Sequence, residues 1–258
     1  MAFLTVKINS LSEFLVAVEK ASHQMDCHTS DVWYRGVSDE SYNLLPGIKW
    51  RRIDEIKHRG MVNEFLTNAV QYQDIGNLPP FELYALMQHY GLPTRLLDWS
   101  LSPLTALYFS LEKDENENRR VVWALNPTRL NKIAVNADAI IYPHDAKQYD
   151  NYNLEGYLPI SLRNVSVKSC EKPIAILVKS SNKRIASQQG AFTIHGSGSE
   201  KIDDMFTDDD ITEIVKFEIN GKDVRDSMLM SLRTINIRED TIYQDLNALS
   251  IRIAREYS

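Results

Sequence analysis

The sequence predicts an α+β fold formed by a single domain. Its 258 residues and 43% hydrophobic content suit one domain with a large core. Several short segments are β-branched and aromatic, or alternate in hydrophobicity as strands do. Segments with helical periodicity gather near the N-terminus, in the middle and at the C-terminus, which disfavours a regular βαβ repeat. The expected strands are residues 31–38, 94–99, 121–125, 173–180, 188–196 and 212–220.

The first part of the chain is expected to be helical. Ser10 and Glu13 form a capping-box pattern, and apolar residues then recur on one helical face. We therefore expect residues 1–30 to form a helical lead-in. Residues 31–38, "DVWYRGVS", are short, aromatic and β-branched, and Gly36 interrupts them. This pattern indicates a strand that ends where backbone must come close to another group.

Two helices are expected before the next strand, and a third directly after it. Residues 53–72 carry apolar side chains at helical spacing, with Ile56 and Val70 among those expected to point inward. A second helix opens at a Pro-Pro pair and ends at Gly91. The third starts at Ser102, a preferred capping residue, with proline at the first helical position.

The second half of the chain is expected to be more irregular. The apolar run 121–125 indicates an interior strand. Residues 126–172 are rich in Asn, Tyr and Asp, so we expect an irregular insertion of loops and short helices there. Residues 212–220 alternate as a strand should, and two helices are expected to follow over 222–236 and 239–258.

Composition excludes several classes of protein. A net charge of −6 and a pI near 5.6 disfavour wrapping nucleic acid by bulk charge, although a local basic patch is compatible with them. The first ten residues lack a signal-peptide pattern, and no run approaches the roughly 18 apolar residues of a membrane span. Cys27 and Cys170 are too few for a disulfide scaffold. We expect a cytoplasmic protein with free thiols and no membrane partner.

The stretch "YRG", residues 34–36, is a candidate anion site. Arg35 lies on an expected strand, and its planar guanidinium suits a phosphate. Gly36 would let a ligand approach the backbone. The alternative is a surface arginine paired with an acidic residue.

A second candidate is "QHYGLPTRLLDWS", residues 88–100. It combines a helix end, a strand and the cap of the next helix, whose N-terminus is a natural anion site. Alternatively, Asp98 bonds an arginine and Ser102 is only a cap. The polar groups favour a site, because buried polar groups must all find partners. Its candidate site residues are His89, Gly91, Thr94, Arg95, Asp98, Ser100 and Ser102.

The third candidate is "QQGAFTIHG", residues 188–196. Gln189 is expected to hydrogen-bond a ligand in a pocket, and Phe192 to stack on it. The sequence lacks the dinucleotide fingerprint, the phosphate-binding lysine motif and the nucleophile elbow. The cysteines and the acidic residues lack zinc and calcium spacing, so no metal is expected.

These three segments resemble the FRG domain family, which is named for its Phe/Tyr-Arg-Gly motif. The motif is residues 34–36 here, and the most specific stretch is residues 88–111. Residues 184–196 and 241–253 are also similar to family segments. The resemblance spans most of the chain and implies a single FRG domain over residues 1–258.

The order of motifs also resembles ADP-ribosyltransferases of the Arg-Ser-Glu type. The resemblance implies an α+β domain with a mixed, split β-sheet core, flanked by N- and C-terminal helices, and NAD as substrate. Arg35 would hold the pyrophosphate, and Ser100 and Ser102 would brace the pocket. Gln189 stands where the class has Glu, so it would contact the nicotinamide ribose without a formal charge. Asp98 would position Arg35 or His89.

The missing carboxylate leaves three outcomes open. Another acid such as Asp98 serves, the acceptor is already nucleophilic, or the domain binds a nucleotide without turnover. The first hypothesis is an ADP-ribosyltransferase-like enzyme, a bacterial toxin or phage-defence effector with a protein or nucleic-acid acceptor and an inhibitory partner. The second is a non-catalytic nucleotide- or nucleic-acid-binding module. A nuclease or hydrolase using His89 and Asp98 ranks last.

The expected site residues follow from both resemblances. The expected catalytic residues are Arg35, Gln189 and Asp98. The expected cofactor-binding residues are Tyr34, Gly36, His89, Gly91, Thr94, Arg95, Ser100, Ser102 and Phe192.

Overall fold

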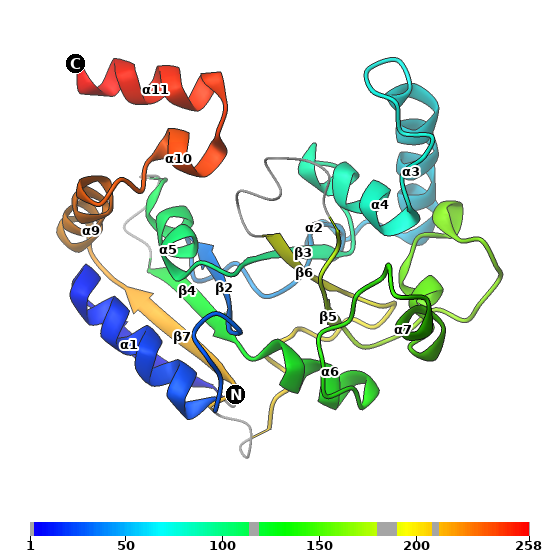
Figure 1. Ribbon diagram of the computed structural model, residues 1–258, viewed down its shortest axis with the longest axis horizontal. Coiled ribbons are helices and arrows are strands. Elements are labelled where there is room, and N and C mark those ends of the chain that lie inside the picture. Colours follow the sequence, from blue (N-terminus) through cyan, green and yellow to red (C-terminus); the bar gives the residue numbers. More distant parts are fainter. Residues whose placement is uncertain (1–2, 114–118, 180–189, 208–211, 258) are drawn as a thin grey trace.

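A computed structural model describes residues 3–113, 119–179, 190–207 and 212–257 (Figure 1). Its centre is one seven-stranded sheet in the order β1-β7-β4-β2-β3-β6-β5. β1 is parallel to β7, and the other neighbours are antiparallel. The α+β prediction and the mixed sheet are confirmed, and each expected strand overlaps an observed one. The strands are β1 (Leu4–Ile8), β2 (Trp33–Val37), β3 (Leu96–Ser100), β4 (Arg120–Leu125), β5 (Ile174–Ile176), β6 (Gly190–Ile194) and β7 (Ile214–Ile219).

The sheet is almost divided in two between β2 and β3. Tyr34 and Ser100 are the one residue pair that joins these strands. On its other edge β2 pairs with β4 over five positions, and β3 likewise pairs with β6 over five. β2 and β3 therefore diverge beyond the Tyr34–Ser100 pair. We call this divergence the fork.

Helices cover one face of each half of the sheet. On the β1-β7-β4-β2 half lie α1 (Leu11–Gln24), α5 (Pro103–Leu111) and α9 (Lys222–Thr234), which share one apolar core with these strands. On the β3-β6-β5 half, α3 (Glu55–Ala69) and α4 (Pro80–His89) share a second core. Figure 1 shows the two groups of helices on either side of the fork.

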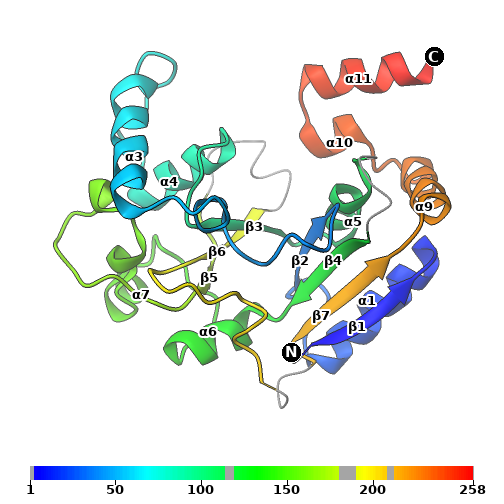
Figure 2. The same ribbon diagram turned by 180° about the vertical axis from the view of Figure 1, so that it is seen from behind.

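The opposite face of the sheet has its own core. Side chains alternate along β2, so that Tyr34 lies in the first core while Trp33 and Val37 lie in this third one. Leu97 and Trp99 join it from β3. Figure 2 shows the molecule from behind, where β1 and β7 run side by side. The third core therefore spans both halves of the sheet beneath the fork.

The remaining elements are short. Residues 126–172 form loops and short helices, as expected, and Leu154, Tyr157 and Leu158 from this region are buried in the second core. None of the described helices has the length and apolar character needed to cross a membrane. The remaining helices and turns are α2 (Gly47–Trp50), α6 (Pro127–Val135), α7 (Ala146–Asn151), the 3-10 turns η1 (Leu154–Tyr157) and η2 (Ile160–Leu162), α10 (Glu239–Tyr243) and α11 (Leu246–Glu256).

Three local expectations differ from the structure. The segment expected to be a helical lead-in begins with strand β1, which pairs with β7 through residues distant in sequence. The single helix expected over 239–258 is divided at Gln244, whose φ is 50°. Ile56 in α3 and Val70, which directly follows the helix, are 85% and 61% exposed, because the helix turns Val62 inward instead.

Candidate functional site

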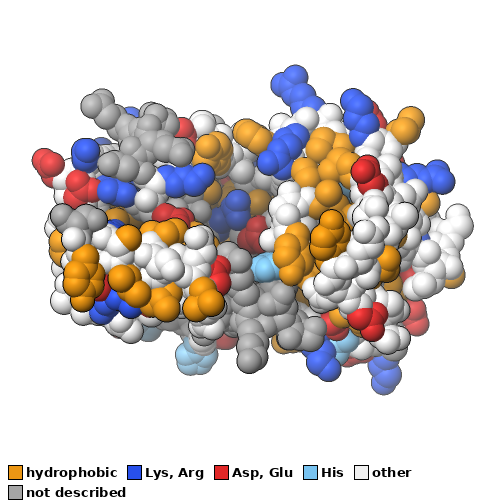
Figure 3. Space-filling model, turned by 90° about the horizontal axis from the view of Figure 1, so that it is seen from above, with side chains coloured by type: hydrophobic (Ala, Val, Ile, Leu, Met, Phe, Trp, Pro, Cys, Tyr) orange, Lys and Arg blue, Asp and Glu red, His pale blue; other side chains and the backbone are white. Residues whose placement is uncertain are grey.

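A pocket opens at the fork, between α4 and α5. Seen from above, the molecule is hollowed between the two groups of helices, with basic and acidic side chains visible in the hollow (Figure 3). The cavity volume is about 90 Å³, below the roughly 300 Å³ of the smallest drug-sized sites, so it encloses one small group. Its lining comprises Tyr34, Arg35 and Gly36 of β2, Ala85, Gln88 and His89 of α4, Asp98, Trp99 and Ser100 of β3, Ala106 and Phe109 of α5, and Phe192 of β6.

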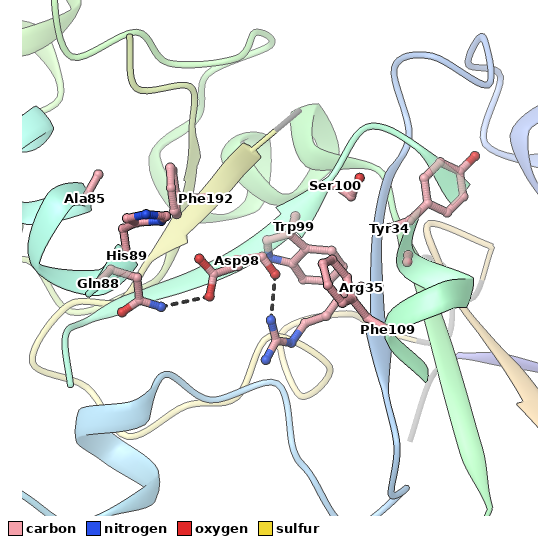
Figure 4. Close-up of a pocket in the computed structure, with 12 residues that line it drawn as sticks. Tyr34, Arg35, Ala85, Gln88, His89, Asp98, Trp99, Ser100, Phe109 and Phe192 are labelled. Carbon is pink, nitrogen blue, oxygen red and sulfur yellow. Dashed lines mark hydrogen bonds between the residues drawn. The ribbon is translucent and has the colours of Figure 1, made fainter. Parts of the chain in front are cut away.

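Arg35 bridges the two diverging strands. Its Nη1 donates to the backbone oxygen of Asp98 at 2.7 Å (Figure 4). Its Nε is buried and has no hydrogen-bond partner among the described residues. Burial lowers the pKa of the guanidinium, against the opposing effect of the Asp98 carboxylate, but arginine stays charged in proteins. A half-buried charge held by a backbone oxygen suits an anionic ligand.

The carboxylate of Asp98 points away from this bond. Its Oδ2 accepts a hydrogen bond from Nε2 of Gln88 at 2.8 Å (Figure 4). Asp98 is exposed at the pocket wall and is the one acid among the described lining residues. Arg35 thus meets the backbone of Asp98, whereas the carboxylate remains directed to α4 and the cavity. The hydrogen bond between the two residues therefore runs through the main chain of Asp98, and the role expected of its carboxylate stays a prediction.

Gly36 has a different role from the one expected. A Cβ atom at this position would lie 1.7 Å from the backbone oxygen of Ala106 and 2.8 Å from the nitrogen of Ser110. The absent side chain therefore lets helix α5 lie directly on β2. Gly36 contributes backbone to the pocket wall, but the close approach belongs to the helix and not to a ligand.

Tyr34 also serves mainly the fold. Its side chain is 1% exposed and belongs to the core beneath α5. Its hydroxyl donates to the backbone oxygen of Thr29 at 3.3 Å, and burial raises its pKa. Figure 4 shows the ring directed away from the guanidinium of Arg35. Tyr34 therefore supports the fork from within the core.

The two serines build the turn from β3 into α5. The hydroxyl of Ser100 accepts from the backbone nitrogen of Ser102 at 3.0 Å. The hydroxyl of Ser102 accepts from the nitrogen of Thr105 at 3.2 Å and so caps the helix, as predicted. Ser100 lines the pocket and Ser102 does not. The two serines thus stabilise a local turn, and one of them lies at the cavity.

Three further expected binding residues do not line the pocket. Gly91 has φ of 85° and ends α4 sharply. Thr94 is fully buried, and its hydroxyl contacts the side-chain oxygen of Gln88. Arg95 is buried in an ion pair with Glu55, and its backbone nitrogen donates to Tyr84 at 2.7 Å. These residues shape the segment behind the pocket, because their polar groups are already paired there.

The remaining expected residues divide into two groups. His89 and Phe192 line the pocket. Gln189 lies outside the described residues. The next residue, Gly190, pairs with Ser100 across β6 and β3.

Sequence reasoning missed Gln88, Ala85, Trp99, Ala106 and Phe109. On α4, the positions 85, 88 and 89 lie on one helical face, since residues three and four apart are neighbours. Positions 106 and 109 on α5 share a face in the same way. The signal that could have found them is this spacing on the two helices next to the strand with Asp98.

The described part of the chain holds no group of three or more His, Cys, Asp or Glu side chains arranged for a metal ion.

Fold and site together define an α+β protein with a pocket at the fork of a mixed sheet, lined by both apolar and charged side chains. Comparison with known families shows that residues 30–119 match the FRG domain. The match contains Tyr34-Arg35-Gly36 and the 88–111 stretch, so the FRG resemblance is confirmed over these residues. No solved structure and no curated protein matches the chain.

Proposed function

We propose that the fork pocket binds part of NAD, and that the protein is an ADP-ribosyltransferase-like domain that modifies an acceptor. The observation that carries the proposal is the half-buried guanidinium of Arg35 at the fork, with its buried Nε unpaired among the described residues and its Nη1 on a backbone oxygen. Such a group favours a phosphate, which supplies both charge and hydrogen bonds. A sheet whose halves are joined by one residue pair supports the expected split core.

The roles follow from two charged side chains of the pocket lining, Arg35 and Asp98. Arg35 holds the pyrophosphate, and Asp98 accepts a hydrogen bond from a ribose hydroxyl. The cavity encloses one small group, so the rest of the dinucleotide extends through its open side. In the reaction the bond between nicotinamide and ribose breaks, with its electron pair leaving on nicotinamide. A nucleophile of the acceptor then forms a bond to the same ribose carbon and loses its proton.

Negative charge is the main catalytic requirement of this reaction. Positive charge develops on the ribose as nicotinamide leaves, and a fixed carboxylate near it lowers the barrier. Gln189 supplies an amide at the sequence position where the class has Glu. Asp98, the one acid on the described pocket wall, is then the group that supplies the charge.

The second candidate is a nucleotide-binding module without turnover. One observation favours it: the described pocket wall carries a single carboxylate, and that carboxylate is already hydrogen-bonded to Gln88. A site of this kind can hold a nucleotide through Arg35 without promoting bond cleavage.

An assay with labelled NAD separates the two candidates. The protein is incubated with NAD labelled in the adenosine part, with and without cell lysate, and nicotinamide release and transferred label are measured. The first proposal predicts both signals, and their loss in Arg35→Ala, Asp98→Asn and Gln189→Ala. Arg59→Ala, an exposed residue of α3, is the matched control and keeps them. Turnover that survives Arg35→Ala contradicts the proposal, and saturable binding without turnover supports the second candidate.

A further inference from the structure

A chain of hydrogen bonds leads from the interior to the pocket. The hydroxyl of Thr94, which is fully buried, contacts Oε1 of Gln88. Nε2 of Gln88 in turn donates to Oδ2 of Asp98 at 2.8 Å. We infer that Gln88, held by Thr94, is a positioning residue that aims the Asp98 carboxylate at a ribose hydroxyl of the ligand. This inference rests on the proposed function.

The chemistry of Thr94, Gln88 and Asp98 determines which group donates in each of these hydrogen bonds. An ionised carboxylate only accepts hydrogen bonds, so the amide nitrogen of Gln88 must face Asp98. Its amide oxygen therefore faces Thr94, whose hydroxyl must donate. The backbone nitrogen of Leu96 donates into the same hydroxyl at 3.0 Å, which leaves the single hydroxyl proton for Gln88.

Each polar atom of the Gln88 side chain has a hydrogen-bond partner within the protein. One amide proton goes to Asp98, and the second is directed to the backbone oxygen of Leu96 at 3.5 Å. Its amide oxygen is taken by Thr94. Both amide protons of Gln88 are therefore directed to protein acceptors, and its oxygen already accepts from Thr94. Its effect on a ligand passes through Asp98, which makes it a positioning residue.

Asp98 keeps one oxygen for the ligand. Oδ2 is held by Gln88, whereas Oδ1 has no hydrogen-bond partner among the described residues. An oxygen of this kind selects a donor such as a hydroxyl and disfavours a second anion. Arg35 on the other strand of the fork selects the anion. The pair thus recognises a ribose hydroxyl and a phosphate of one ligand.

The backbone conformation after α4 makes these hydrogen bonds possible. Gly91 has φ of 85°, which reverses the chain directly after α4. The reversal returns Thr94 to the side chain of Gln88, six residues earlier. β3 then starts at Leu96 and carries Asp98 to the same amide. One continuous segment, residues 88–98, therefore contains Gln88, Thr94 and Asp98, the three residues joined by these hydrogen bonds.

The first test observes the Gln88 amide directly, without any ligand. The protein is labelled with ¹⁵N-glutamine, and Gln88→Met assigns the Gln88 side-chain signal by its disappearance. We expect two well-separated, slowly exchanging protons in the native protein. Thr94→Val and Asp98→Asn should move and broaden them, and Thr94→Ser, which restores the hydroxyl, should return them. A Gln88 signal that behaves like an exposed glutamine, or ignores Thr94→Val, overturns the inference.

The second test measures ligand discrimination. Binding of NAD is compared with that of an NAD analogue that lacks one hydroxyl of the nicotinamide ribose, taking the 2′ and 3′ positions in turn. The native protein should prefer NAD by about tenfold or more over one of these analogues, as expected for a lost hydrogen bond to a charged group. Gln88→Met and Thr94→Val should lose most of this preference, and Thr94→Ser should keep it. An unchanged preference in folded Gln88→Met contradicts the positioning role.

The two tests fail in different ways. If NAD does not bind the native protein, the proposed function fails while the amide signal still decides whether Gln88 is locked between Thr94 and Asp98. If NAD binds but the amide signal ignores Thr94→Val, the proposed function survives and the positioning role is wrong. Thermal unfolding of each variant confirms that the compared proteins are folded.

Discussion

The backbone oxygen of Ala106 lies 1.7 Å from the point where residue 36 would carry a Cβ atom. Any side chain at position 36 must therefore push α5 away from β2. Because Tyr34 and Ser100 form the one pair between β2 and β3, a shift of α5 also reaches the fork. The glycine of the Tyr-Arg-Gly motif is thus explained by packing, whereas the role of the arginine in the site is our proposal.

Gly36→Ala should destabilise the protein strongly. A backbone overlap of this size exceeds ordinary overpacking, so we expect a loss of about 3 kcal/mol or more in the free energy of unfolding. Chemical denaturation measures it. Gly60→Ala is the matched control, because a Cβ atom added at Gly60 inside α3 would meet no atom within 4 Å, and it should stabilise by about 0.5–1 kcal/mol. Equal stability of the two variants contradicts the packing role.

Stability should fall in mild acid because of His58. Burial, aided by the charge of Arg95, lowers its pKa from 6.5 to about 4, and its Nε2 lies 3.2 Å from the Tyr84 hydroxyl. Between these pH values the unfolded chain binds a proton that the folded chain does not. The contribution of His58 to stability is therefore complete above pH 6.5 and falls by about 3 kcal/mol as the pH drops to about 4.

Urea unfolding between pH 7.5 and pH 4.5 checks this slope. His58→Gln removes the titrating group and should give a visibly shallower decline. Buried His195, whose pKa burial lowers to about 3, leaves part of the slope in place. His144→Gln, at an exposed position, should behave as the native protein does. An identical decline in His58→Gln and native protein would show that His58 does not control it.

Ser102→Ala should affect the fold without affecting the site. Its hydroxyl caps α5 at the nitrogen of Thr105, so its loss should cost about 1 kcal/mol. Affinity for NAD should stay the same, because Ser102 does not line the pocket. Ser10→Ala, which removes the corresponding cap of α1, is the control for a loss of similar size. A tenfold loss of NAD affinity in Ser102→Ala alone would place this hydroxyl in the site.

Local signals predicted the elements that depend on local chemistry. The caps at Ser10 and Ser102 and the helix end at Gly91 are where the sequence placed them. β1 was missed because its partner, β7, lies about 200 residues further along the chain. The break at Gln244 was missed because a left-handed residue other than glycine leaves no clear sequence signal.

The sequence likewise predicted some of the residues that line the pocket and misplaced others. Arg35, Asp98, Ser100 and Phe192 were found from their motifs, and all line the pocket. Thr94 and Arg95 were assigned to the ligand, but hydrogen bonds to Gln88 and Glu55 hold them behind it. Which polar residue faces a cavity depends on how helices pack over the sheet, and residue type alone does not encode that.

We propose that Arg35 holds the phosphates of a nucleotide at the fork. Calorimetric titration of NAD into the purified protein tests it most directly, with Arg35→Ala and the control Arg59→Ala in parallel. We predict saturable binding at one site, weaker by about tenfold or more in Arg35→Ala and unchanged in Arg59→Ala. Equal affinity of the native protein and Arg35→Ala, or no saturable binding by the native protein, would show that Arg35 does not hold the phosphates.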